Sequence, residues 1–168
     1  YLRETDTHVQ TVRAFIAEQR RRAEPHRLSE AVYRACHTLS GSSKMAEQRH
    51  GIRLAEPLDH WLRRSWNSGV GLSSTDLGLL EDGMEAMLQV ARHPDESSGF
   101  FVDHDVLRAR IAAAEADLDR RIAVAAEASA AAASEVLALH GAPEHRAETQ
   151  SRPAPALESA AWAPQQDA

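Results

Sequence analysis

Apolar residues recur along this chain every three or four positions, in stretches separated by polar turn signals. This spacing is typical of helices that bury one face, because about 3.6 residues complete a helical turn. Runs of Val, Ile, Tyr and Thr, which favour strands, are nearly absent. The pattern therefore predicts five helices, over residues 5–22, 28–45, 52–66, 74–92 and 103–140.

Several predicted helix ends carry recognisable signals. Residues 67–69, Asn-Ser-Gly, form a stop signal for the third helix. Ser73 and Asp76 fit a capping box at the start of the fourth, in which each side chain accepts a backbone N–H. Proline inside a helix costs about 3 kcal/mol. The third helix is therefore expected either to begin near Glu56 or to bend at Pro57.

The second half of the last predicted helix differs from every other helical segment. Up to residue 122 it keeps apolar side chains near a heptad spacing, but beyond Ala123 this seam fades into alanine. Alanine favours helix and offers little surface for packing. Residues 123–140 are therefore expected to protrude as a helical extension. Residues 141–168, rich in Pro, Ala, Glu and Gln, are expected to form a flexible linker.

Composition narrows the class of protein. A chain of 168 residues has room for one ordinary domain, and its richness in Ala, Leu, Arg and Glu with few aromatics favours an all-α fold. A net charge of −6 argues against a nucleic-acid binder. The single Cys36 excludes an internal disulfide and a thiolate metal site, and it fits a reducing, cytoplasmic location.

The ends of the chain and its hydropathy suggest a soluble piece of a larger protein. No apolar stretch looks long enough to cross a bilayer and no signal-peptide pattern is present, so no membrane partner is expected. The chain begins at Tyr1 with helix-like sequence at once. This start suggests a fragment cut from a longer protein.

His37 stands out on the second predicted helix. On a wheel that starts at Leu28, the apolar positions lie within about 40° of Leu28, whereas His37 lies at about 180°. His37 is therefore expected to face solvent. The positions expected on or beside the same outer face are Tyr33 one turn earlier, Gly41 one turn later, Lys44 two turns later, and Ser40 to one side.

The neighbours of His37 suggest access by a partner and a negatively charged group. Glycine inside a helix costs roughly 0.5 to 1 kcal/mol against alanine, so Gly41 needs a reason, and close approach of another protein is one. Lys44 offers positive charge. A neutral imidazole is nucleophilic and can carry a phosphoryl group. The pattern is therefore compatible with a phosphoryl group on His37, although an exposed helical histidine taken by itself is more often an ordinary surface residue.

The segment His37-Thr38-Leu39-Ser40-Gly41-Ser42-Ser43 closely resembles the motif of histidine phosphotransfer (HPt) domains, His-x-Leu-Lys-Gly-Ser-Ser or similar. The resemblance implies an antiparallel four-helix bundle over residues 28–122, with an extra N-terminal helix in residues 1–27 and the long C-terminal helix beyond. It implies that His37 is the phosphoacceptor, that Gly41 gives access, and that small residues after it allow tight helix packing. The sequence of residues 44–46 and 54–58 looks most like that of HPt modules of CheA-like hybrid kinases in pilus chemotaxis systems.

One position departs from that motif. HPt domains usually have lysine directly before the glycine, where this chain has Ser40. Either Lys44 or a nearby arginine then stabilises the phosphoryl group, or the domain is a degenerate docking or spacer module without phosphotransfer. Both alternatives remain open from the sequence.

The resemblance also implies the partners. They are response-regulator receiver domains and the ATP-binding domain of a histidine kinase, which would supply ATP and Mg²⁺. The chain itself shows no glycine-rich phosphate loop, so no kinase activity of its own and no cofactor are expected. A metal-binding bundle is a further alternative. His50 with His60, or His93 with His104, lack the spacing that one helix needs to bind a metal.

Overall fold

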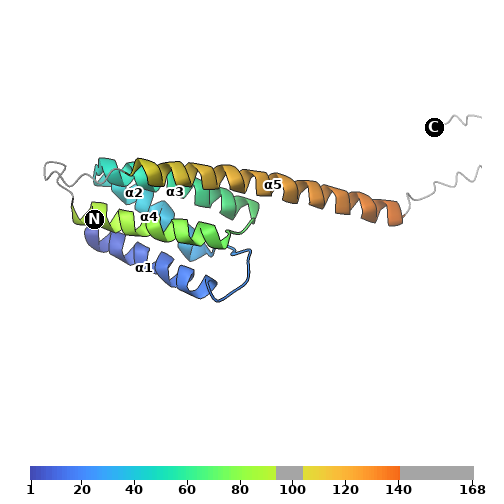
Figure 1. The fold of residues 1–168 in the computed structure, drawn as a ribbon, viewed down its shortest axis with the longest axis horizontal. Coiled ribbons are helices and arrows are strands. Elements are labelled where there is room, and N and C mark those ends of the chain that lie inside the picture. The colour runs from blue at the N-terminus through green and yellow to red at the C-terminus, as the bar shows by residue number, and fades with distance from the viewer. Residues whose placement is uncertain (94–103, 141–168) are drawn as a thin grey trace, which may run out of the picture.

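The protein is described here from a computed structural model, which places residues 1–93 and 104–140. Within these ranges the fold is all-α, as predicted, and holds no strand beyond one isolated bridge between His26 and Leu72. The helices are α1 (Leu2–Gln19), α2 (Glu30–Met45), α3 (Arg49–Ser68), α4 (Ser74–Arg92) and α5 (Asp105–Leu139). Successive helices run in alternating directions (Figure 1). The expected linker, residues 141–168, lies outside the described residues.

The capping signals act as predicted. Gly69 ends α3 with a left-handed φ of 70°, which glycine adopts without steric cost. At α4, the backbone N–H of Ser73 donates to Asp76 Oδ2 at 2.8 Å, and Ser73 Oγ accepts from the Asp76 N–H at 3.1 Å. Ser29 Oγ caps α2 by accepting the N–H of Val32. These local bonds set where α3 ends and where α2 and α4 begin.

Pro57 lies well inside α3, not at its start. The helix begins at Arg49, so the expectation that it begins near Glu56 is wrong. Proline cannot donate the backbone hydrogen bond to Arg53, one turn earlier. Arg53 is exposed, so water can satisfy its carbonyl instead.

The first helix is part of the core, contrary to the expectation of an extra helix outside residues 28–122. It packs against α2 and α4, while α3 packs against α2, α4 and α5. Its contribution to the core is Val9, Val12, Phe15 and Ile16, all buried. We call α1–α4 with the first half of α5 the helical core. An amphipathic helix of this length gains more from burying its apolar face than from remaining alone in water.

The connection between α1 and α2 is fastened to the start of α4. His26 and Leu72 exchange two backbone hydrogen bonds of 2.8 Å. The carboxylate of Glu24 accepts hydrogen bonds from Ser74, and these bonds hold the pKa of Glu24 below its usual value. Arg121 of α5 donates to the carbonyl of Gly71 and to the buried Asp76. The loop, α4 and α5 are thereby linked at one end of the core.

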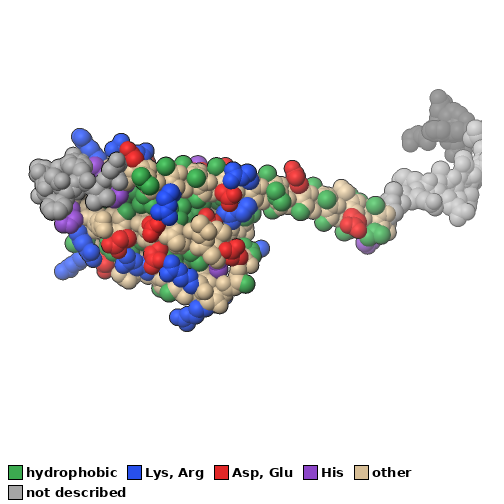
Figure 2. Space-filling view, in the orientation of Figure 1, with side chains coloured by type: hydrophobic (Ala, Val, Ile, Leu, Met, Phe, Trp, Pro, Cys, Tyr) green, Lys and Arg blue, Asp and Glu red, His purple; other side chains and the backbone are tan. Residues whose placement is uncertain are grey.

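The predicted seam of α5 packs on the core, and the expected extension follows it. Ile111, Ala114 and Leu118 are buried, whereas every residue from Ala123 to Leu139 is exposed. Figure 1 shows this half of α5 running on alone past the other helices. In the space-filling view the extension is mostly apolar, while charged side chains gather over the helical core (Figure 2).

The length and composition of α5 correct one sequence expectation. An 18-residue window of it reaches a mean hydropathy of 1.6 with at most two charged residues, none of the window being buried. By length and composition alone such a helix is long enough to cross a membrane, so the expectation that no stretch is long enough was too strong. The apolar character of this window comes mainly from alanine, whereas the sequence expectation was based on larger apolar side chains. This criterion alone is weak evidence for a membrane span.

Candidate functional site

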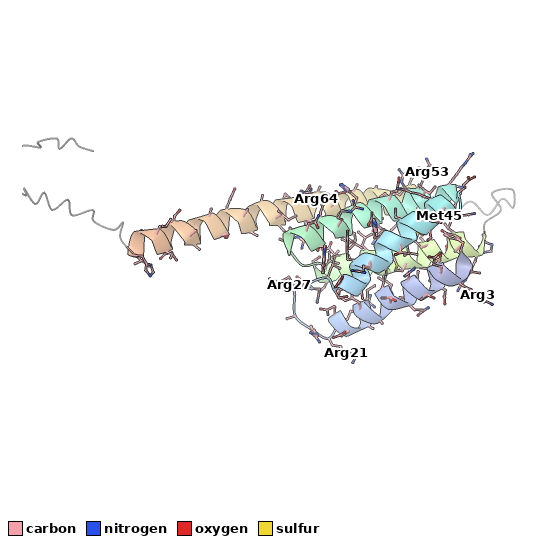
Figure 3. The ribbon with its side chains drawn as sticks, turned by 180° about the vertical axis from the view of Figure 1, so that it is seen from behind. Arg3, Arg21, Arg27, Met45, Arg53 and Arg64 are labelled. Carbon is pink, nitrogen blue, oxygen red and sulfur yellow. The ribbon has the colours of Figure 1, made fainter. Side chains whose placement is uncertain are left out.

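His37 lies on the outer face of α2, as the helical wheel predicted. Its side chain is 59% exposed, while Val32, Ala35 and Leu39 on the opposite face are buried. Viewed from behind, α2 and α3 lie on the near side of the molecule (Figure 3). The imidazole is therefore accessible from solvent along the junction of these two helices.

Two residues of α3 that sequence reasoning missed complete the surroundings of the imidazole. His37 Nδ1 lies 3.2 Å from Asp59 Oδ1 and 3.3 Å from an Nη of Arg63. The same Nη of Arg63 donates to Asp59 Oδ2 at 2.6 Å. Asp59 and Arg63 are four residues apart and therefore share one face of α3. The three side chains form a cluster, which we call the His37 cluster.

The two partners of His37 Nδ1 make opposite demands on the tautomer of the ring. An ionised carboxylate can only accept hydrogen bonds and a guanidinium can only donate them. Asp59 favours a proton on Nδ1, whereas a bond from Arg63 would need a lone pair there. Arg63 already donates to Asp59 at the shorter distance of 2.6 Å, so the Nδ1–H tautomer gives every group of the cluster a partner. Among the described residues no hydrogen bond to His37 Nε2 is found, and the side chain as a whole is 59% exposed. The side chain of Asp59 is only 10% exposed, which favours strong pairing with its two donors.

An aromatic stack continues the outer face on the N-terminal side of His37. The half-buried ring of Tyr33 stacks on His37 with centroids 6.1 Å apart, and on Trp66 of α3 with centroids 5.5 Å apart and an interplanar angle of 3°. Trp66 is 38% exposed. The stack restricts the ring of His37 from one side and provides an exposed aromatic surface next to it.

Lys44 is on the predicted face but is already paired. Its Nζ lies 2.8 Å from Glu56 of α3. Seven residues separate it from His37, or about 10 Å along the helix axis. Met45, the next residue, projects freely from the C-terminal end of α2 (Figure 3). In this arrangement Lys44 and the imidazole are not brought together.

Ser40 is not at the side of the outer face, where it was expected. It is 4% exposed, so it cannot reach a group on His37 or a partner protein. The reason is that α2 packs between α1 and α3, which makes its buried face wider than one stripe. Ser43, three residues later, is also buried and lies where α2 and α3 approach each other closely. A Cβ added to Gly51 of α3 would lie 3.0 Å from Ser43 Oγ.

Gly41 is exposed, one turn beyond His37. A Cβ built at this position would meet nothing within 4 Å. The packing of the protein itself therefore gives no reason for glycine here, in contrast to Gly51. A helix-weakening residue retained on an open surface is consistent with contact by another molecule.

The thiol beside His37 is not a competing nucleophile. Cys36 is fully buried, and desolvation, helped by the negative charge of Asp59, raises its pKa to about 12. A thiol reacts through its thiolate, which is scarce at neutral pH when the pKa is so high. Of the two neighbouring residues Cys36 and His37, only His37 presents its nucleophilic group to solvent.

Within residues 1–93 and 104–140 no group of three or more His, Cys, Asp or Glu side chains could hold a metal ion. His60, one of the histidines considered for a metal, instead pairs through Nδ1 with Glu115 of α5 at 2.5 Å. No protein-family model, no curated protein and no solved structure matches the chain. The chemistry of the His37 cluster is therefore the guide to function.

Proposed function

We propose that this protein is a phosphotransfer module of the HPt type, in which His37 Nε2 accepts a phosphoryl group and passes it on. The observation that carries the proposal is an exposed imidazole whose Nδ1 lies 3.2 Å from a nearly buried carboxylate. With the proton on Nδ1, Nε2 is the nucleophilic nitrogen. Its place in the motif that ends in Gly41-Ser42-Ser43 adds support. On this proposal the four-helix bundle of the HPt type is formed by α1–α4, since α1 lies between α2 and α4.

The reaction follows from the charges of the cluster. The Nε2 lone pair attacks phosphorus of an aspartyl phosphate on a receiver domain, the bond from phosphorus to the carboxyl oxygen breaks, and the receiver carboxylate leaves. The ring keeps its Nδ1–H and becomes a cation as the N–P bond forms. Asp59 faces that proton directly and stabilises the positive charge. Return of the group to a second receiver carboxylate reverses these steps.

The partners supply the rest of the chemistry. An exposed histidine needs only correct orientation and access when the receiver, or the ATP-binding domain of a kinase, brings the phosphoryl group with its own Mg²⁺. The aromatic surface of Tyr33 and Trp66 and the open position at Gly41 flank His37 on its two sides along α2 and α3. Both features suit contact with a protein partner. A cytoplasmic location, where such partners and ATP occur, is part of the proposal.

The test uses phosphoramidate, a small donor that phosphorylates imidazole directly. Ammonia leaves as the N–P bond to histidine forms, so no partner protein is needed. We expect an acid-labile, alkali-stable label on His37, mapped by mass spectrometry, and onward transfer to one or more isolated receiver domains with Mg²⁺. His60 is the internal control, because it is equally exposed and is also paired through Nδ1 with a carboxylate. Labelling of His37 no faster than His60, with no transfer to any receiver, would contradict the proposal.

Replacing Gly41 with alanine separates access from nucleophilicity. Because the added Cβ meets nothing within 4 Å, Gly41→Ala is expected to raise the free energy of unfolding by about 0.5–1 kcal/mol. Labelling by phosphoramidate should stay unchanged, whereas exchange with a receiver domain should slow. Gly41→Leu should slow that exchange further. Chemical denaturation and the two labelling rates measure these effects, and equal receiver exchange in all three proteins would show that Gly41 has no role in access.

A further inference from the structure

We infer that Arg63 holds the phosphoryl group on His37, in the role that the lysine before the glycine has in the HPt motif. This inference rests on the proposed function and assigns a residue that the motif does not contain. The position of that lysine is occupied here by Ser40, whose burial prevents any contact with His37. A phosphoryl group on an exposed ring nitrogen carries about two negative charges, so a cation has to come from elsewhere in the surroundings.

The two cations of α2 on either side of His37 in the sequence are both engaged away from it. Arg34, one turn earlier on α2, pairs with Glu30 at 2.7 Å, toward the start of the helix. Lys44 pairs with Glu56 two turns in the other direction. Only Arg63 lies against the imidazole, with an Nη 3.3 Å from Nδ1. Among the described residues it is therefore the cation best placed to reach a group on the ring.

Arg63 also has hydrogen-bonding capacity left. One Nη donates to Asp59, while its Nε is buried and has no partner among the described residues. Guanidinium groups present several N–H donors in a planar fork that matches the oxygens of a phosphoryl group. Anchoring of the side chain by Asp59 reduces the conformational freedom that would be lost when it binds such a group.

The charges of the His37 cluster change in a direction that favours this role. Before transfer, the Asp59 carboxylate is shared between the imidazole and Arg63. After transfer the ring is a cation, which strengthens its own bond to Asp59. The ring cation then neutralises the Asp59 carboxylate, and the guanidinium of Arg63 can pair with the phosphoryl oxygens. The phosphorylated cluster thereby keeps each negative group beside a positive one.

Bound arginine should also slow loss of the group. Phosphoryl transfer to water passes through a loose transition state, in which negative charge on the three peripheral oxygens is lower than in the phosphorylated protein. A cation on those oxygens therefore stabilises the phosphohistidine more than the transition state. The half-life of the label reports the role of Arg63 directly.

The experiment measures that half-life at His37 after phosphoramidate labelling, with the label on His60 of the same molecules as reference. Arg63→Gln is expected to shorten the half-life at His37 roughly tenfold and to lower the labelled fraction at equilibrium. Arg63→Lys, which keeps the charge, should restore most of the half-life. Lys44→Gln is the matched control and should change it less than about twofold, since exposed ion pairs contribute little. Circular dichroism establishes that each variant is folded.

The outcomes separate the two proposals. If His37 is labelled and exchanges with receivers but Arg63→Gln leaves its half-life unchanged, the role of Arg63 is refuted and the phosphotransfer function stands. A Lys44→Gln effect as large as that of Arg63→Gln would also overturn the assignment. If the wild-type protein is not labelled at His37, the proposed function fails and the role of Arg63 fails with it. A merely structural role would change the melting temperature without changing the half-life relative to His60.

Discussion

The His37→Gln variant is expected to take up no phosphoryl group at position 37 from phosphoramidate and none from a phosphorylated receiver domain. Glutamine keeps the polarity and approximate size of histidine but has no basic nitrogen with a free lone pair, so the N–P bond cannot form. The side chain at this position is largely exposed, so the substitution should leave the helical core and its melting temperature nearly unchanged. The measurement is the acid-labile label on residue 37, mapped by mass spectrometry, with the label on His60 of the same molecules as reference.

Asp59→Asn provides the comparison for that result. An amide can still occupy the space beside His37 Nδ1, but it carries no charge to stabilise the ring cation and can present an N–H to Nδ1, which favours the unreactive tautomer. We expect labelling of His37 to be slowed by at least about tenfold, without the complete loss expected for His37→Gln. Transfer from a phosphorylated receiver that persists in His37→Gln, or a transferred label that survives acid, would place the phosphoryl group on another residue and end the proposal.

Cys36 is expected to react with a thiol reagent roughly a thousandfold more slowly in the folded protein at pH 8 than in denaturant. Its burial raises the thiol pKa to about 12, against 9.0 for an unperturbed thiol on the same scale. Only a minute fraction of the folded protein therefore carries a thiolate at pH 8. Absorbance of the released chromophore of a disulfide reagent gives both rates, and a native rate close to that of a small free thiol would show that Cys36 is accessible.

The same raised pKa makes stability depend on pH in a defined direction. Because the thiol ionises more readily in the unfolded chain than in the folded one, its contribution to stability is fully present below about pH 9. The contribution is lost as pH rises from there toward about 12. Cys36→Ala removes this term, so the difference in unfolding free energy between wild type and variant should shrink over that range. A constant difference from pH 7 to pH 11 would contradict the assigned pKa.

The local features of the fold were predictable because they depend on neighbours in sequence. The stop at Gly69 and the capping box of Ser73 and Asp76 each involve residues within one helical turn, and the structure confirms both. The exposure of His37 followed from one helical period. None of these predictions needed to know which helix packs against which.

The features that were missed depend on the relative placement of helices. A wheel gives the face of α2 but not which residue of α3 lies at the same height as His37, so Asp59 and Arg63 were not assigned to the site. One signal was present: Asp59 is a carboxylate directly after Leu58 in the buried stripe of α3, and buried charges need partners. The burial of Ser40 was missed for a related reason, because the packing of α1 beside α2 was not foreseen.

The exposed half of α5 determines how far from the helical core, and in which direction, the described chain ends. Seventeen residues of helix beyond Ile122 extend about 25 Å from the last contact with the core. The packed half supplies the helical nucleus, so this segment continues as a rod where an isolated alanine-rich peptide of its length would be marginal. A rigid helix limits the volume that an attached domain can explore and gives that domain a preferred orientation relative to the helical core. Inserting two residues into this helix would rotate the attached domain by about 200° about the helix axis with little change in length. A flexible tether would not transmit such a rotation.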